Sequence, residues 1–232
     1  MKKRLLTVLA IAGGIIICLY ILGRITGGLQ FYKVTTGSNL PTLKTDSYIF
    51  SSNLITPKRF NFICYYHTDS ITGMAAIYVH RLCGLPGDII QIKAGNLFVN
   101  GKPADGQLSL KLDYIIPDTS FQTVVELAQL SDEEQFIPYP PKSAIVALTN
   151  KNCETLNAHK IPLKRRIREA QQPDDYIQHI YGHPWNEDNF GPITVPSNHY
   201  FVLGDNRYRA QDSRYTGFIP VNDFYGTVLG RE

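Results

Sequence analysis

The segment IIQIKAGNLFVNGKP, residues 89–103, decides the fold class. Two short apolar runs, Ile89–Ile92 and Leu97–Val99, are separated by the turn signal Gly95-Asn96. Asn100-Gly101 follows, and this pair is a strong signal for a two-residue hairpin because both residue types tolerate the positive φ of a type I′ turn. The segment therefore predicts short strands joined by tight turns.

The same pattern continues on both sides of this segment. Aromatic and β-branched runs at Ser47–Ser51, Asn61–Tyr66, Ala76–Val79 and Ala144–Leu148 alternate with turn residues. A chain of short strands with few helical stretches favours a mainly β body, either barrel-like or a sandwich.

Two stretches are candidate helices, Phe121–Leu130 and Lys160–Gln171. The second is strongly basic, and both contact with anionic lipid and a solvated helix face fit that pattern. Its cations are Lys160, Lys164, Arg165, Arg166 and Arg168.

The N-terminal segment predicts a membrane anchor. Leu5 to Gly23 carries no charge and, as a helix, would reach about 28 Å, close to the hydrocarbon thickness of roughly 30 Å. Lys2, Lys3 and Arg4 precede it, so the positive-inside rule places residues 1–4 in the cytoplasm and the body outside. A cleaved signal peptide is the alternative, but its apolar region is normally shorter and is followed by a small-x-small site.

The charge of the body argues against nucleic acid as a partner. The 232-residue chain has a formal charge of +3, but four of its 23 basic residues lie in the first 24 positions, which hold no acidic residue. The remainder is close to neutral. There is no C-x-x-C pair among the four cysteines, which excludes zinc-ribbon and redox motifs, although a disulfide among Cys64, Cys83 and Cys153 stays open. We expect no metal, because Gly182 and Pro184 should make His179-x3-His183 a loop.

Three segments carry candidate chemistry. Thr36-Gly-Ser-Asn-Leu-Pro-Thr-Leu43 is a restrained turn that can expose the hydroxyl of Ser38. Tyr78–Asp88 contains His80, a possible general base, next to Arg81. Tyr200–Pro220 runs from an apolar strand into clustered Asp, Asn and Arg residues that can brace a site.

Together these segments resemble type I signal peptidases, which are membrane-bound serine proteases of the S26 class. Ser38–Leu43 matches the S-x-x-P-T-L box of the nucleophile, and Arg81–Asp88 matches the R-x-x-G-x-P-G-D box. Gly204–Arg207 and Asp212–Pro220 match the last box. The resemblance covers residues 1–101 and 185–221. It implies a catalytic domain at 30–101 and 185–232 and a variable, β-rich domain inserted at 102–184.

Three positions depart from the family pattern. Asn39 stands where a Met is usual, and Ala210 stands where a Ser often supports the base. His80 occupies the position of the bacterial Lys base, as in the signal peptidases of the endoplasmic reticulum. A His needs no large pKa change to accept a proton at neutral pH, so we expect an apparent pKa near 6.5, raised if Asp205 or Asp212 orients the ring. Lys33, Lys93 and Lys102 do not occupy the base position.

The resemblance implies a serine endopeptidase of the bacterial cytoplasmic membrane that cleaves signal peptides from secretory preproteins without a cofactor. Its partners would be these preproteins and the lipid bilayer. Two alternatives stay open: an inactive binding or assembly protein, and an S26 peptidase with one dedicated substrate. The implied catalytic pair is Ser38 and His80, with the backbone N–H of Ser38 and the Thr36 hydroxyl as the oxyanion hole. The site-supporting residues would be Arg81, Gly204, Asp205, Asn206, Asp212, Ser213 and Arg214.

Overall fold

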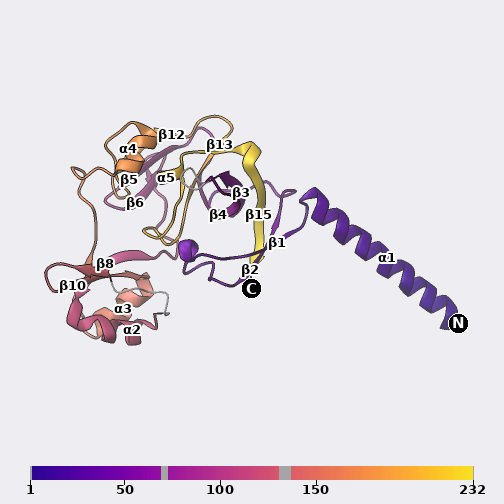
Figure 1. Ribbon diagram of the computed structural model, residues 1–232, viewed down its shortest axis with the longest axis horizontal. Coiled ribbons are helices and arrows are strands. Elements are labelled where there is room, and N and C mark those ends of the chain that lie inside the picture. Colours follow the sequence, from indigo (N-terminus) through magenta and orange to yellow (C-terminus); the bar gives the residue numbers. More distant parts are fainter. Residues whose placement is uncertain (1, 69–72, 131–136, 232) are drawn as a thin grey trace.

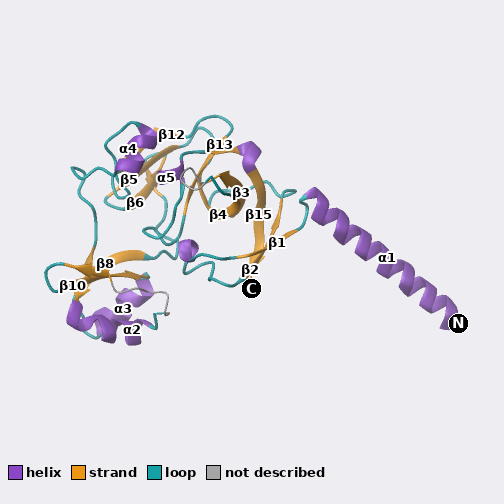
Figure 2. Cartoon of the chain, in the orientation of Figure 1, coloured by secondary structure: helices purple, strands orange, loops and turns teal. Residues whose placement is uncertain are grey.

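The computed structural model describes residues 2–68, 73–130 and 137–231. One long helix, α1 (Lys2–Thr26), projects away from a body made of sheets (Figure 1). Strands dominate that body (Figure 2), which confirms the predicted mainly β class. Within the described residues, α1 is the one helix long and apolar enough to cross a membrane, with a mean hydropathy of 2.7 and no buried residue.

The largest sheet has seven antiparallel strands in the spatial order β1-β2-β15-β3-β4-β13-β14. The last strand, β15, lies between β2 and β3, so both ends of the body belong to one sheet. Three predicted strand runs are confirmed here as β2, β3 and β4. The bounds are β1 (Gln30–Lys33), β2 (Tyr48–Ser52), β3 (Phe62–Thr68), β4 (Ala75–Gly84), β13 (His199–Leu203), β14 (Ile219–Pro220) and β15 (Phe224–Arg231).

The segment 89–103 forms the centre of a second sheet, in the order β12-β5-β6-β7. Asn100 and Gly101 have φ values of 52° and 75°, and they close the turn that sets Val99 opposite Lys102, as predicted. The preceding turn is Ala94-Gly95, one residue earlier than the predicted Gly95-Asn96. The bounds are β5 (Ile89–Lys93), β6 (Asn96–Val99), β7 (Lys102–Pro103) and β12 (Phe190–Thr194).

A third sheet, in the order β11-β8-β10-β9, packs against two helices (Figure 1). Ile116, Val124, Val146 and Leu156 form its buried core, separate from the core of the other sheets. Helix α2 lies inside the predicted stretch 121–130, which confirms that helix. The bounds are β8 (Leu112–Pro117), β9 (Ile137–Tyr139), β10 (Ser143–Leu148), β11 (Lys164–Arg165), α2 (Phe121–Ala128), α3 (Asn150–Ala158) and the 3₁₀ turn η2 (Asp118–Ser120).

The predicted helix over Lys160–Gln171 is wrong. This stretch contains only the short strand β11, and its arginines bind groups outside the stretch instead of lining one helix face. The Arg166 guanidinium lies 3.6 Å from Glu187, and the Arg168 guanidinium lies 3.1 Å from the same carboxylate. Arg165 donates to the carbonyl of Gly95 on the second sheet. These three arginines therefore bind groups of the protein itself, so we do not propose that they contact lipid.

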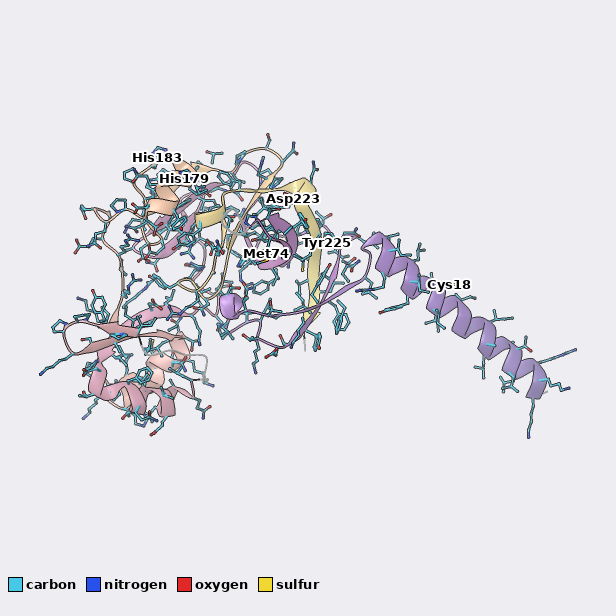
Figure 3. The ribbon with its side chains drawn as sticks, in the orientation of Figure 1. Cys18, Met74, His179, His183, Asp223 and Tyr225 are labelled. Carbon is cyan, nitrogen blue, oxygen red and sulfur yellow. The ribbon has the colours of Figure 1, made fainter. Side chains whose placement is uncertain are left out.

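Residues 175–181 form helix α4 (Asp175–Tyr181), where the sequence predicted a loop. Asp174 caps the helix N-terminus, and Gly182 ends the helix with a φ of 69°, so this glycine stops the helix instead of preventing it. Ile177 of α4 packs into the core beneath the second sheet, with Phe190 and Phe201. His179 lies in the last turn of this helix, and His183 follows its end (Figure 3). Among the described residues, no group of three His, Cys, Asp or Glu is placed to hold a metal, and all four cysteines are free.

Candidate active site

Ser38 lies on a single 3₁₀ turn, η1 (Gly37–Asn39), between β1 and β2. Its Oγ is 3.0 Å from the hydroxyl of Thr36, and its side chain is half-buried at the wall of a cavity of about 430 Å³. The buried Asn39 donates to the carbonyl of Val79 at 2.7 Å and, at 3.4 Å, to the Oγ of Ser38. Asn39 thus ties the turn of the candidate nucleophile to strand β4.

The segment after β13 also binds η1, the turn that carries Ser38. The backbone N–H of Asn206 donates to the carbonyl of Ser38 at 3.0 Å, and its side chain donates to the carbonyl of Gly37 at 3.1 Å. Gly204 is required here, because a Cβ would lie 2.5 Å from the Ser38 carbonyl oxygen and 2.3 Å from the Cβ of Ala210. Two predicted support residues, Gly204 and Asn206, therefore contact the nucleophile turn directly.

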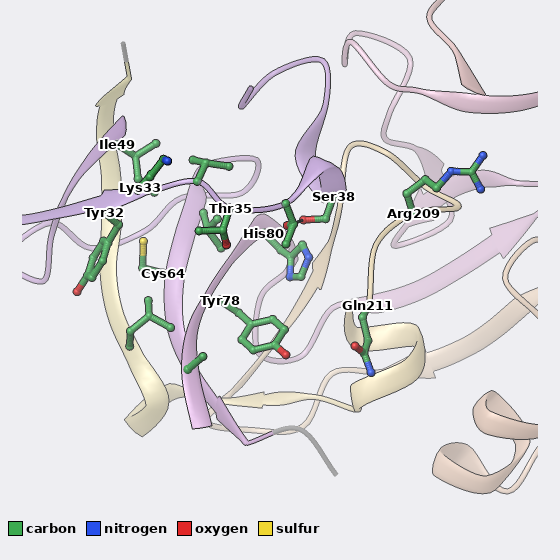
Figure 4. A pocket seen from close by; sticks show the side chains of 15 residues that line it. Tyr32, Lys33, Thr35, Ser38, Ile49, Cys64, Tyr78, His80, Arg209 and Gln211 are labelled. Carbon is green, nitrogen blue, oxygen red and sulfur yellow. Dashed lines mark hydrogen bonds between the residues drawn. The ribbon is translucent and has the colours of Figure 1, made fainter. Parts of the chain in front are cut away.

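His80 lies on β4, and Figure 4 shows its ring beside Ser38 at the same cavity. Its side chain is buried, and its Nδ1 is 2.8 Å from the phenolic oxygen of Tyr65 on β3. The structure thus brings Ser38 and His80 together, although they are 42 positions apart in the chain. Neither the contact with Tyr65 nor that residue was predicted, because the sequence alone does not give the register of β3 against β4.

The pKa of His80 differs from the expectation near 6.5. Burial lowers it to about 4. The negative charges of Asp212 and Asp205 raise the pKa again in part, while the positive charges of Arg214 and His67 lower it. The imidazole is therefore neutral at neutral pH because of its surroundings, and not because its pKa is ordinary.

Neither candidate aspartate binds the His80 ring among the hydrogen bonds of the described residues, which corrects that expectation. Asp205 accepts two hydrogen bonds from Arg81, at 2.7 and 2.5 Å. Asp212 accepts two from the guanidinium of Arg214, both at 2.9 Å, one from the backbone N–H of Arg214 at 3.2 Å and one from the backbone N–H of Gly204. Burial alone would raise the pKa of Asp212, but the adjacent Arg214 charge brings it below its usual value. Both carboxylates brace the loop and act on His80 only through space.

The last support residues complete this buried bracing. Helix α5 (Ser213–Thr216) starts at Asp212, and the Ser213 hydroxyl accepts from the backbone N–H of Val202 on β13. Arg81 also donates to the carbonyl of Phe60, beyond its pair with Asp205. The predicted support residues therefore lie on β4, on the segment after β13 and on α5. One lysine, Lys33, lines the cavity, and it pairs with Asp46 at 2.6 Å.

Comparisons with known proteins identify the family of the chain. The chain matches the family described as signal peptidase, peptidase S26, over residues 5–231. The signal peptidase I of Buchnera aphidicola subsp. Baizongia pistaciae is 27% identical over 221 residues, covering 85% of this chain and 67% of its own length. A probable signal peptidase I-2 of Synechocystis is 22% identical over 204 residues, covering 85% of this chain and 60% of its own.

The chain thus spans about two thirds or less of the length of these two curated relatives. A solved signal peptidase I from Enterococcus faecalis is 22% identical, with a TM-score of 0.36, and the match covers 76% of this chain and 98% of the other.

Proposed function

Because the chain belongs to the family of signal peptidases of the peptidase S26 type, we propose that it is a serine endopeptidase that removes N-terminal signal peptides from exported preproteins. The observation that carries this proposal is the meeting of Ser38 and His80 at one cavity, on two separate elements, η1 and β4, that Asn39 joins through its hydrogen bond to Val79. The comparisons do not favour an inactive binding protein or a peptidase with one dedicated substrate.

The reaction would be an acyl transfer. The Oγ of Ser38 attacks the scissile carbonyl while the Nε2 of His80 takes the hydroxyl proton. The backbone N–H of Ser38 and the hydroxyl of Thr36 donate to the oxyanion, and His80 then protonates the leaving amine. Water activated by His80 releases the acyl group from Ser38. The imidazolium formed in each step lies in the field of Asp212 and Asp205, which offsets part of the cost of charging a buried ring.

The substrate would bind as an extended strand. Strand β4 pairs with β3 over residues 75–81, whereas its described pairing with β13 involves only residues 81–84. Ala76 to His80 also line the cavity, so the other edge of β4 faces the space that a substrate would fill. A peptide added at this edge would hydrogen-bond through its backbone and direct alternate side chains into the cavity. The family resemblance implies Ala-like residues at the first and third positions before the cut.

We place the protein in a bacterial cytoplasmic membrane, with α1 as a single span. The charge bias around α1 favours a cytoplasmic N-terminus and an extracytoplasmic body. Exposed apolar side chains on the strands that follow α1 and on the turn after β2, including Phe31, Tyr48 and Leu54, suit contact with the bilayer. The sheet β11-β8-β10-β9 with α2 and α3 would be the variable part of the inserted domain at 102–184.

The proposal is tested by incubating the full chain in detergent with a preprotein that carries a small-x-small cleavage site. We expect one cut after that site, abolished in Ser38→Ala and retained in Ser47→Ala, a matched change at a serine that is also half-buried and lies on a loop. Mass spectrometry of the product should give the new N-terminus. Cleavage by Ser38→Ala at the wild-type rate would remove Ser38 from the reaction, and the absence of any cleavage by the wild type would contradict the proposed function.

A further inference from the structure

The hydrogen bond between His80 and Tyr65 has no counterpart in the predicted site. On the β3–β4 hairpin, Ile63 lies opposite His80, and Tyr65 lies opposite Tyr78. Tyr65 and His80 are therefore diagonal neighbours on one face, within reach of aromatic side chains. The phenolic oxygen is 2.8 Å from Nδ1, and Tyr65 is fully buried. One nitrogen of the imidazole is thus engaged inside the sheet, and Nε2 is the nitrogen left for Ser38.

A buried histidine base usually has a carboxylate or carbonyl on its second nitrogen. Here both nearby carboxylates are committed to arginines, Asp205 to Arg81 and Asp212 to Arg214. The phenol of Tyr65 occupies the place that such a carboxylate would take. The charged and titratable groups that surround the ring are Asp212, Arg214, Asp205, His67, Tyr65 and Tyr78.

We propose that Tyr65 is the positioning residue of His80: the Nδ1–H donates to the phenolic oxygen and so fixes the tautomer in which Nε2 can accept the proton of Ser38. This inference rests on the proposed Ser38–His80 reaction. In the opposite arrangement the phenol would donate to Nδ1, Nε2 would carry a hydrogen, and it could not act as the base. With Nδ1 protonated throughout, the proton of Ser38 moves to Nε2 and then to the leaving amine, while the bond to Tyr65 stays in place.

The first test measures the tautomer and needs no substrate. The full chain, labelled with ¹⁵N-histidine in detergent micelles, should show at pH 7 a protonated Nδ1 and an unprotonated Nε2 for His80. The signal is assigned by its loss in His80→Gln. A protonated Nε2 in the wild-type protein would overturn the inference. Because this readout does not depend on activity, it separates failure of the inference from failure of the proposed function.

The second test is kinetic and uses Tyr65→Phe, which removes one oxygen, with Tyr66→Phe as the matched control. Tyr66 is the next residue on β3, and its side chain is exposed. We expect kcat to fall at least about tenfold in Tyr65→Phe with KM within about twofold, and both to stay unchanged in Tyr66→Phe. The acid limb of kcat/KM should move to lower pH, because the imidazolium loses an acceptor.

A loss of packing alone would lower the melting temperature. It would change neither the pH of the acid limb of kcat/KM nor the tautomer of His80. Wild-type kcat together with the wild-type tautomer in Tyr65→Phe would overturn the inference. If Tyr65→Phe does not fold, the tautomer of the wild-type protein still decides.

Discussion

Replacing His80 by Gln should change how the stability of the protein depends on pH. Burial lowers the pKa of His80 from 6.5 to about 4 in the folded protein. Between these two pH values the unfolded chain binds a proton that the native protein does not. The free energy of unfolding therefore rises with pH across this window. The contribution of His80 to this free energy is lost as the pH falls from 6.5 to about 4.

The size of the effect follows from the same two values. The gap between 6.5 and about 4, at about 1.4 kcal/mol per pH unit, corresponds to roughly 3 kcal/mol. This loss is a large share of the stability of an ordinary domain, which is about 5–15 kcal/mol. Gln keeps a hydrogen-bonding side chain of similar size but does not titrate. Carboxylates that also titrate in this window are common to both proteins, so the difference between them isolates His80.

The assay is urea unfolding of the full chain in detergent at several pH values between 7 and 4. The wild type should lose roughly 3 kcal/mol more than His80→Gln over this range. The control is His159→Gln, which changes an exposed side chain at the C-terminal end of helix α3. Its stability should depend on pH as that of the wild type does. If wild type and His80→Gln lose stability in parallel, the ring is not held neutral by burial, and the account of its pKa is wrong.

Three further predictions concern the bracing and the anchor. Asp212→Ala leaves the buried Arg214 without its partner and should lower the free energy of unfolding by about 3–5 kcal/mol. Asp46→Ala breaks an exposed pair and should lower it by under about 1 kcal/mol, so equal melting temperatures of the two variants would contradict this reasoning. Asn39→Ala removes the bond to the Val79 carbonyl and should cost about 1 kcal/mol and lower kcat; an unchanged kcat would make Asn39 only structural. In cells with an opened outer barrier, external protease should digest the body, and mass spectrometry should find residues 1–26 still attached; a shortened soluble form would contradict the anchor.

Much of the fold could be predicted because the local signals agree with one another. The Asn100-Gly101 turn and the apolar runs around it depend on the backbone preferences of a few neighbouring residues, and they form the expected hairpin. The turn that carries Ser38 was also predictable from Gly37 and Pro41. The helix predicted at Lys160–Gln171 failed for the opposite reason, because Arg166 and Arg168 follow distant carboxylates instead of a local helical pattern.

The chemistry of His80 depends on contacts that local patterns do not contain. The bond to Tyr65 requires the register of β3 against β4, which the sequence does not give. The low pKa of the ring requires the depth at which β4 is buried. The pairing of each aspartate with an arginine requires the fold of the loop after β13, where five charged residues lie between positions 205 and 214. For these reasons a sequence can name the residues of this site but not their partners.

The most direct test of the account is a double-mutant measurement of preprotein cleavage. Wild type, Ser38→Ala, His80→Gln and the double variant are compared by kcat/KM on the same preprotein in detergent. If Ser38 and His80 act as one unit, each single change should lower the rate about as much as both changes together. The account would be contradicted if His80→Gln cleaved at near the wild-type rate. It would also be contradicted if the fold-loss of kcat/KM in the double variant equalled the product of the two single losses, because the two residues would then act independently and the base of the reaction would lie elsewhere.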